Sequence, residues 1–179
     1  MALLASRASL LFACAIHSVA HSQTWHFGAN AGLNFSSGSP VAVGGGMSYS
    51  LDSSTSACDE QGGLLFYSNG MQVWDRSHTL MPNGSSLMGS NNGGQCALAV
   101  PWPGTNKFYL FTVGQWNAAS GLRYSVIDMD LNGGFGDVSI ANQLLFTPST
   151  ERLAAVYDPA GESWWVITHA WSSSQFRTF

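Results

Sequence analysis

Two stretches of this chain align with each other without a gap. Residues 97–113 and 153–169 lie 56 positions apart, and each contains a strand-forming run, a turn and a second strand-forming run. Four pairs of positions are identical, namely Ala99/Ala155, Val100/Val156, Pro103/Pro159 and Thr112/Thr168. Such a repeat constrains the fold more than any single residue does, because each copy has to bury its apolar face against a neighbouring copy.

A shorter copy of the same unit precedes these two. It consists of residues 56–58, a turn at 59–62 and the apolar run 64–67, about 45 residues upstream of the second copy, near the period of propeller blades. Runs of β-forming residues bounded by turn residues predict the strands of all three copies. The predicted strands cover 55–58, 63–68, 71–75 and 78–81 in the first copy, 97–101, 107–113, 122–128 and 143–147 in the second, and 153–157, 163–168 and a start near Gln175 in the third.

Turn residues separate these runs where hairpins are expected. Asn69-Gly70 predicts a two-residue hairpin turn with both residues at positive φ. Pro103-Gly104 predicts the turn that closes the first hairpin of the second copy. No segment predicts a helix. The remaining segments are a predicted strand pair at 24–35 and long loops rich in Ser and Gly at 36–54 and 82–94.

We therefore predict an all-β fold, a partial β-propeller of about two and three-quarter four-stranded blades that occupies residues 23–179. The third copy stops within a blade at Phe179, and closed propellers usually have about four to eight blades. The chain is therefore expected to be a fragment of a larger propeller. Its partners would include the missing C-terminal blades or domains of the parent protein.

Residues 1–22 have the pattern of a signal peptide. Arg7 is followed by the apolar stretch 8–16 and then by small residues that suit a cleavage site. This stretch is too short for a permanent membrane-spanning helix, so the protein is expected to be secreted or displayed on the outer cell surface. A lipid anchor at Cys14 is an alternative, which the bulky Phe12 disfavours.

Charged residues are scarce in this chain. They make up 9% of its 179 residues, against about 25% in an ordinary soluble domain. The net charge is only −4, and the sequence has no cluster of Lys and Arg. Nucleic-acid binding is therefore not expected, because neutralising phosphates requires such a cluster.

Cys58 and Cys96 would remain after removal of the signal peptide, and a disulfide between them is the default expectation in an oxidising compartment. The repeat argues against it. If the two strands run parallel, the cysteines lie about four residues apart along them, or roughly 13 Å, which is beyond disulfide reach.

Several phrases of the sequence together resemble the N-terminal β-propeller region of secreted surface proteins associated with gliding motility. Those proteins are similar to type IX secretion substrates and often carry PKD-like repeats. The resemblance runs from about Trp25 to the end of the chain, and it implies export and surface display rather than a defined activity. The phrases are Trp25-His-Phe-Gly-Ala-Asn-Ala-Gly-Leu-Asn-Phe, Gly63-Leu-Leu-Phe-Tyr-Ser-Asn-Gly-Met-Gln-Val-Trp-Asp, Leu80-Met-Pro-Asn-Gly, Gly121-Leu-Arg-Tyr-Ser-Val-Ile-Asp-Met, Leu131-Asn-Gly-Gly-Phe-Gly-Asp-Val and Trp165-Val-Ile-Thr-His.

One segment partly matches a calcium-binding loop. Asp128-Met-Asp-Leu-Asn-Gly133 supplies carboxylates at alternate positions, but Ser139 stands where the bidentate acid should be. A turn explains Asn132-Gly133 without an ion, so no metal or other cofactor is predicted.

The aromatic residues are the strongest candidates for ligand binding. Trp116 follows the second strand of the second copy, and Trp171 follows the equivalent strand of the third, so both are expected on one face of the propeller. Indole rings suit sugar CH groups or a protein partner, although tryptophans also commonly pack between blades. Arg123 and His169 could add hydrogen-bond donors nearby.

These features predict a non-catalytic binding or scaffolding module, an adhesion-type part of a larger secreted protein, with a glycan or a surface protein as its ligand. No Gly-x-Ser-x-Gly motif and no metal-ligand spacing of histidines is present. The alternative is an enzyme, a propeller-borne hydrolase or lactonase in which acids and His169 would meet at the central channel.

Overall fold

The structure is a computed structural model, and it describes residues 23–115 and 120–179. The chain forms four antiparallel sheets that follow one another in sequence, and none of them is closed. The first sheet contains β1 (Thr24–Phe27), β2 (Ala31–Asn34) and β3 (Val41–Val43), and the second contains β4 (Thr55–Cys58), β5 (Leu64–Ser68) and β6 (Val73–Asp75). The third contains β7 (Ala97–Trp102), β8 (Lys107–Val113), β9 (Leu122–Asp128) and β10 (Asp137–Phe146), and the fourth contains β11 (Ser149–Asp158), β12 (Ser163–Ala170) and β13 (Phe176–Thr178).

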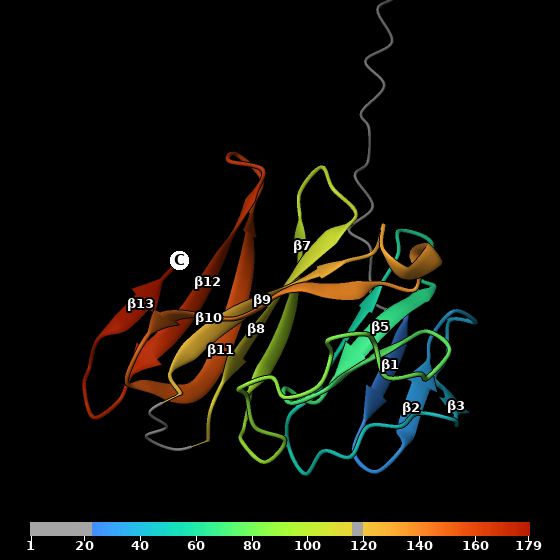
Figure 1. The fold of residues 1–179 in the computed structure, drawn as a ribbon, viewed down its shortest axis with the longest axis horizontal. Helices are drawn as coiled ribbons and strands as arrows, with labels where there is room; N and C mark the ends of the chain where they lie inside the picture. Colours follow the sequence, from blue (N-terminus) through green and yellow to red (C-terminus); the bar gives the residue numbers. More distant parts are fainter. Residues whose placement is uncertain (1–22, 116–119) are drawn as a thin grey trace, which may run out of the picture.

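The fold is all-β, as predicted. In the described part of the chain the one helical element is the short 3-10 turn η1 (Asn132–Gly134), between β9 and β10. No helix there is long and apolar enough to cross a membrane. The sheets fan out in chain order in Figure 1, from β3 at one side to β13 at the other.

The 56-residue repeat is confirmed in the strand pairing. Strands β7 and β8 pair from Ala97 opposite Thr112 to Trp102 opposite Lys107. Strands β11 and β12 pair from Leu153 opposite Thr168 to Asp158 opposite Ser163, in the same register. Equivalent residues of the two hairpins therefore lie on equivalent faces of their sheets, because side chains alternate along a strand.

The predicted turn at Asn69-Gly70 is wrong. Ser68 pairs with Val73, so four residues join β5 to β6, and only Gly70 of the predicted pair has a positive φ, at 86°. The Asn69 side chain is the cause, because its Oδ1 accepts hydrogen bonds from the backbone N–H groups of Met71 and Gln72. These hydrogen bonds hold the turn in place without a second residue in the left-handed backbone conformation.

Other strand boundaries also differ from the prediction. Strand β10 begins at Asp137 instead of residue 143, and it bends through several register shifts against β9. The predicted strand at 78–81 is only an isolated bridge between Leu80 and Trp74. The predicted N-terminal pair gains a third strand, β3, which lies inside the predicted loop 36–54.

The third sheet is covered by apolar side chains on both of its faces. On one face, Leu110 and Ile127 pack in a buried cluster with Phe66 of the second sheet. On the other face, Phe111 and Leu122 pack in a second cluster that includes Val166 of the fourth sheet. The third sheet therefore lies between its two neighbours in sequence.

The first and second sheets meet at a cluster of three rings. His26 of β1 lies 4.5 Å from Tyr67 and 5.1 Å from His78, measured between ring centroids. The Tyr67 hydroxyl accepts the Met47 N–H and shares a hydrogen bond of 3.1 Å with Nδ1 of His78. His26 is buried, and its Nδ1 has no hydrogen-bond partner.

Acidification is expected to destabilise the fold at this cluster. Burial, and next the charge of His78, lower the pKa of His26 below its usual value of 6.5, and a backbone hydrogen bond at Ala31 opposes them. The unfolded chain therefore takes up a proton at His26 near pH 6.5, whereas the folded chain takes it up only at lower pH, so stability falls as the pH drops through this window. Urea unfolding between pH 8 and 5 measures this loss.

The matched variants for that titration are His26→Phe and His169→Phe. The first is expected to reduce the pH dependence, and the second, in the fourth sheet, is expected to leave it close to that of the unaltered chain. An unchanged pH dependence in His26→Phe would assign the effect to other groups.

Cys96 is a buried free thiol, so no disulfide joins it to Cys58, consistent with the distance argument from the repeat. The Cys58 thiol donates to the Thr24 carbonyl at 3.7 Å. Burial is the main cause that raises the pKa of the Cys96 thiol to about 12. A thiol with that pKa is almost fully protonated at neutral pH, so Cys96 is a poor nucleophile.

Candidate functional site

An open cleft of about 600 Å³ lies between the third and fourth sheets. One wall comes from β7, β8 and β9 and the other from β12 and the end of the chain. Most of the lining residues belong to the two hairpins of the 56-residue repeat. The aromatic lining residues are Trp102, Tyr109, Phe111, Tyr124, Trp164 and Phe179.

Strand alternation places four of these rings, those of Trp102, Tyr109, Phe111 and Tyr124, on the wall formed by the third sheet. Trp102 and Val100 share a face of β7, and Tyr109 and Phe111 share the matching face of β8. The rings of Trp102 and Tyr109 stack at 4.8 Å with an interplanar angle of 18°. The ring of Tyr109 also contacts Tyr124 edge-on at 5.8 Å. The result is a continuous aromatic surface held by three neighbouring strands.

A few polar groups border this surface. Glu162 and Ser163, at the turn into β12, line the cleft together with the phenols of Tyr109 and Tyr124. Burial, followed by the neighbouring Tyr124, raises the pKa of Tyr109 above its usual value of 10.0. Tyr109 therefore keeps its hydroxyl proton at neutral pH and can donate a hydrogen bond to a ligand.

The predicted site residues that the structure describes, Arg123, His169 and Trp171, are not among the residues that line this cleft. Trp116 lies outside the described residues. Arg123 donates from Nε and Nη1 to the backbone carbonyls of Ser120 and Asn142. His169 packs edge-on against the Phe176 ring at 5.0 Å between centroids.

Trp171 lies in the loop after β12 and is 42% exposed. Its backbone N–H donates to the Pro148 carbonyl. The exposed indole is consistent with ligand binding at this loop, and that role stays a prediction. Trp171 is not among the residues that line the aromatic cleft.

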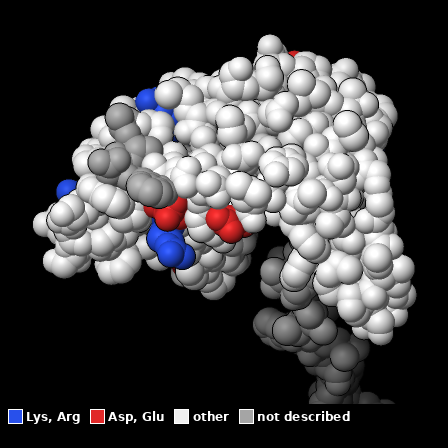
Figure 2. Space-filling view, turned by 90° about the horizontal axis from the view of Figure 1, so that it is seen from below, with Lys and Arg blue, Asp and Glu red and all other residues white. Residues whose placement is uncertain are grey.

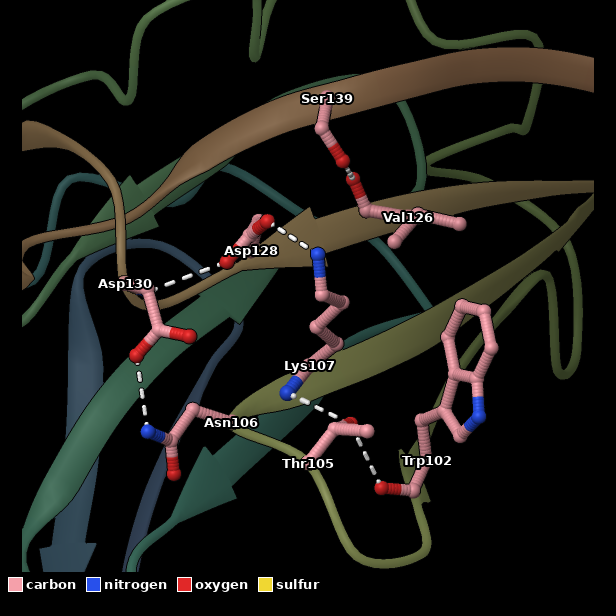
Figure 3. A network of polar contacts seen from close by, with 8 residues as sticks. All are labelled: Trp102, Thr105, Asn106, Lys107, Val126, Asp128, Asp130 and Ser139. Carbon is pink, nitrogen blue, oxygen red and sulfur yellow. Dashed lines mark hydrogen bonds and ion pairs between the residues drawn. The ribbon is translucent and has the colours of Figure 1, made fainter.

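The segment that partly matches a calcium loop uses its carboxylates for contacts within the protein. Figure 3 shows that Oδ2 of Asp128 forms an ion pair with Nζ of Lys107, at 2.5 Å. Oδ1 of Asp128 accepts the Asp130 N–H, and Oδ1 of Asp130 accepts a hydrogen bond from Asn106. Lys107 is the largest cause that lowers the pKa of Asp128. These contacts join the β7–β8 turn to the β9–β10 turn.

Groups of three or more His, Cys, Asp or Glu side chains placed to hold a metal ion do not occur among the described residues. Comparison of the chain with protein-family models, curated proteins and solved structures gives no match.

Proposed function

We propose that this chain is an exported, non-catalytic binding module, that its four sheets are successive blades of a β-propeller, and that its aromatic cleft binds a carbohydrate. The cleft carries the proposal. It combines stacked aromatic rings with a small number of hydrogen-bonding groups on rigid strands.

The order of the sheets supports the propeller arrangement. Each sheet is a meander of consecutive strands, and its first strand contacts the first strand of the next sheet: β1 contacts β4, β4 contacts β7, and β7 contacts β11. Propeller blades are antiparallel sheets arranged radially around a common axis. Contacts between successive first strands are what the innermost strands of neighbouring blades would make.

The chemistry of the cleft supports a sugar as the ligand. Its volume of about 600 Å³ falls within the range of roughly 300–1,000 Å³ that is typical of small-molecule sites. Aromatic faces pack against sugar CH groups, and the phenols of Tyr109 and Tyr124 can donate to sugar hydroxyls. Glu162 is the one charged side chain among the described residues that line the cleft. Charged side chains are also sparse on the face of the molecule drawn in Figure 2. A neutral oligosaccharide suits these walls better than a strongly charged ligand does.

Binding without catalysis is the simpler function for this cleft. Glycoside hydrolysis requires a pair of carboxyl groups facing each other across the bond that breaks. Glu162 is the one acid among the described residues that line the cleft. His169, the residue on which the hydrolase alternative depends, packs against Phe176 instead.

Export to the outer cell surface belongs to the same proposal. The signal-peptide pattern of residues 1–22 and the resemblance to gliding-motility and type IX secretion proteins support it. Antibody labelling of intact cells that produce the protein tests this part separately from ligand binding.

Replacing Trp164 by alanine is expected to weaken carbohydrate binding about tenfold or more, because it removes one aromatic wall of the cleft. A glycan array with the purified chain identifies the ligand, and titration calorimetry with that ligand measures the loss. Trp164→Phe keeps a ring and is expected to retain most of the affinity.

The matched control is Trp171→Ala, which removes an exposed indole outside the cleft. It is expected to bind like the unaltered chain. If Trp171→Ala lost binding while Trp164→Ala kept it, the loop after β12 would be the site. An array with no bound glycan would reject carbohydrate as the ligand.

A further inference from the structure

The turn that joins β11 to β12 brings a carboxylate to the aromatic cleft. Glu162 lies in this turn and is exposed to solvent, and it is the one acidic side chain among the described residues that line the cleft. Trp164 follows two residues later and lines the same cleft. A ligand bound in the cleft can therefore contact both the carboxylate and the indole ring.

The backbone of Glu162 has an unfavourable conformation. Its φ is 46°, in the left-handed region that residues other than glycine seldom adopt. Gly161, which would tolerate this conformation, stands one position earlier in the chain. Among the described residues, no side chain forms an ion pair or a hydrogen bond with the Glu162 carboxylate. Strain that no internal contact explains is typical of ligand-binding positions.

The equivalent position one repeat earlier has a different use. Glu162 corresponds, at 56 positions, to Asn106 in the turn that joins β7 to β8. The Asn106 amide donates to Oδ1 of Asp130 at 2.8 Å, so that side chain joins two turns of the third sheet. The residue with a positive φ in that turn is Gly104, at 72°. The two turns of the repeat therefore differ at the residue that borders the cleft.

The hydrogen-bonding groups of the cleft suit a sugar without charge. An ionised carboxylate only accepts hydrogen bonds, and its two oxygens can accept from two hydroxyls on neighbouring carbons of a sugar ring. A sugar that carries its own carboxylate would instead be repelled by Glu162. No Lys or Arg is among the described residues that line the cleft, so a negative charge on the ligand would have no cation to pair with there.

We propose that Glu162 determines the specificity of the cleft, by accepting hydrogen bonds from the hydroxyls of a neutral sugar and by excluding sugars that carry a carboxylate. The inference rests on the proposed carbohydrate-binding function and names the class of sugar that the cleft selects. It also gives a reason for the strained backbone, because the φ of 46° occurs at the residue that contacts the ligand.

The test uses pairs of ligands that differ in charge. The probe set is an array of hexose oligosaccharides, each also present in a form whose primary hydroxyl groups are oxidised to carboxylates. Titration calorimetry then measures both forms of each pair that binds. The unaltered chain is expected to bind the neutral form about tenfold or more tightly than the oxidised form, because one unpaired like-charge contact costs about that factor.

Glu162→Gln removes the charge and keeps the size of the side chain. It is expected to bind the oxidised form more tightly than the unaltered chain does and to reduce the preference to about twofold or less. Glu60→Gln is the matched control, because Glu60 is an exposed acid in the turn between β4 and β5 and does not line the cleft. This control is expected to keep the full preference for the neutral form.

Glu162→Gly separates binding from a role in the turn. Glycine adopts a positive φ without strain, so the variant is expected to unfold at the same urea concentration as the unaltered chain or at a higher one. Its affinity for the neutral glycan is expected to fall about tenfold, because hydrogen bonds to the carboxylate are lost. A residue that served only the turn would leave that affinity unchanged.

The outcomes distinguish this inference from the proposed function. Equal binding of the neutral and oxidised forms by the unaltered chain would overturn the role of Glu162 and leave carbohydrate binding in place. A preference that persists in Glu162→Gln would do the same. An array on which neither form of any oligosaccharide binds would reject the proposed function, and the selection by Glu162 with it.

Discussion

Phe66→Ala is expected to lower the free energy of unfolding by about 3–5 kcal/mol, the usual cost of removing a buried phenylalanine from a packed core. Phe66 is fully buried, and its ring contacts Phe108 of the third sheet edge-on at 5.2 Å. The variant leaves a cavity between two sheets that are joined mainly by side-chain packing. Urea unfolding monitored by tryptophan fluorescence measures the change.

Phe176→Ala is the matched control, because that phenylalanine is 71% exposed. Its cost is expected to stay within about 0.5 kcal/mol, as for most surface substitutions. Equal destabilisation by the two variants would mean that the second and third sheets do not pack through Phe66.

Leu122→Ala is expected to lower the free energy of unfolding by about 2–5 kcal/mol. Leu122 begins β9, is fully buried, and belongs to the cluster that holds the fourth sheet on the third. Removing it also loosens the wall behind the aromatic cleft, so carbohydrate affinity is expected to fall in the same variant. Chemical denaturation and calorimetry measure the two effects independently.

Leu144→Ala provides the comparison within the same sheet. Leu144 lies on β10 and is 51% exposed, so its removal is expected to cost less than about 1 kcal/mol. A cost equal to that of Leu122→Ala would contradict the burial that separates these two leucines.

The repeated hairpins could be predicted because their signals are local. Strand β9 spans Leu122–Asp128 as predicted, and β8 spans Lys107–Val113 as predicted. Dense β-forming residues bounded by Gly, Pro and Asn determine such strands. The common register of the two hairpins follows from their equal length and turn position.

Other elements could not be predicted because side chains compete with the local pattern. The Asn69 side chain replaces a left-handed backbone position, so the turn is longer than its sequence suggests. Ser139 and Asn142 interrupt the apolar alternation of β10. The Ser139 hydroxyl donates to the Val126 carbonyl of β9, and the Asn142 backbone N–H donates to the Ser125 hydroxyl of β9. Those bonds form only after the two strands have paired.

The cleft depends on contacts that are distant in sequence. Trp102 and Trp164 come from hairpins of different sheets. Each lies in a sequence run with the side-chain alternation of an ordinary core strand. Their shared cleft follows from how the fourth sheet packs on the third. Loop position suggested Trp171 as a ligand-binding residue, whereas the strand residues Trp102 and Trp164 line the open cleft.

The most direct test of the account is a set of nuclear Overhauser contacts from adjacent residues of β8. Sequential side chains point to opposite faces, so Leu110 is predicted to show contacts to Phe66 of the second sheet, and Phe111 is predicted to show contacts to Val166 of the fourth. This pattern would place the third sheet between its two neighbours. Contacts from Leu110 and Phe111 to the same neighbouring sheet would contradict the stacking on which the cleft and its proposed ligand both depend.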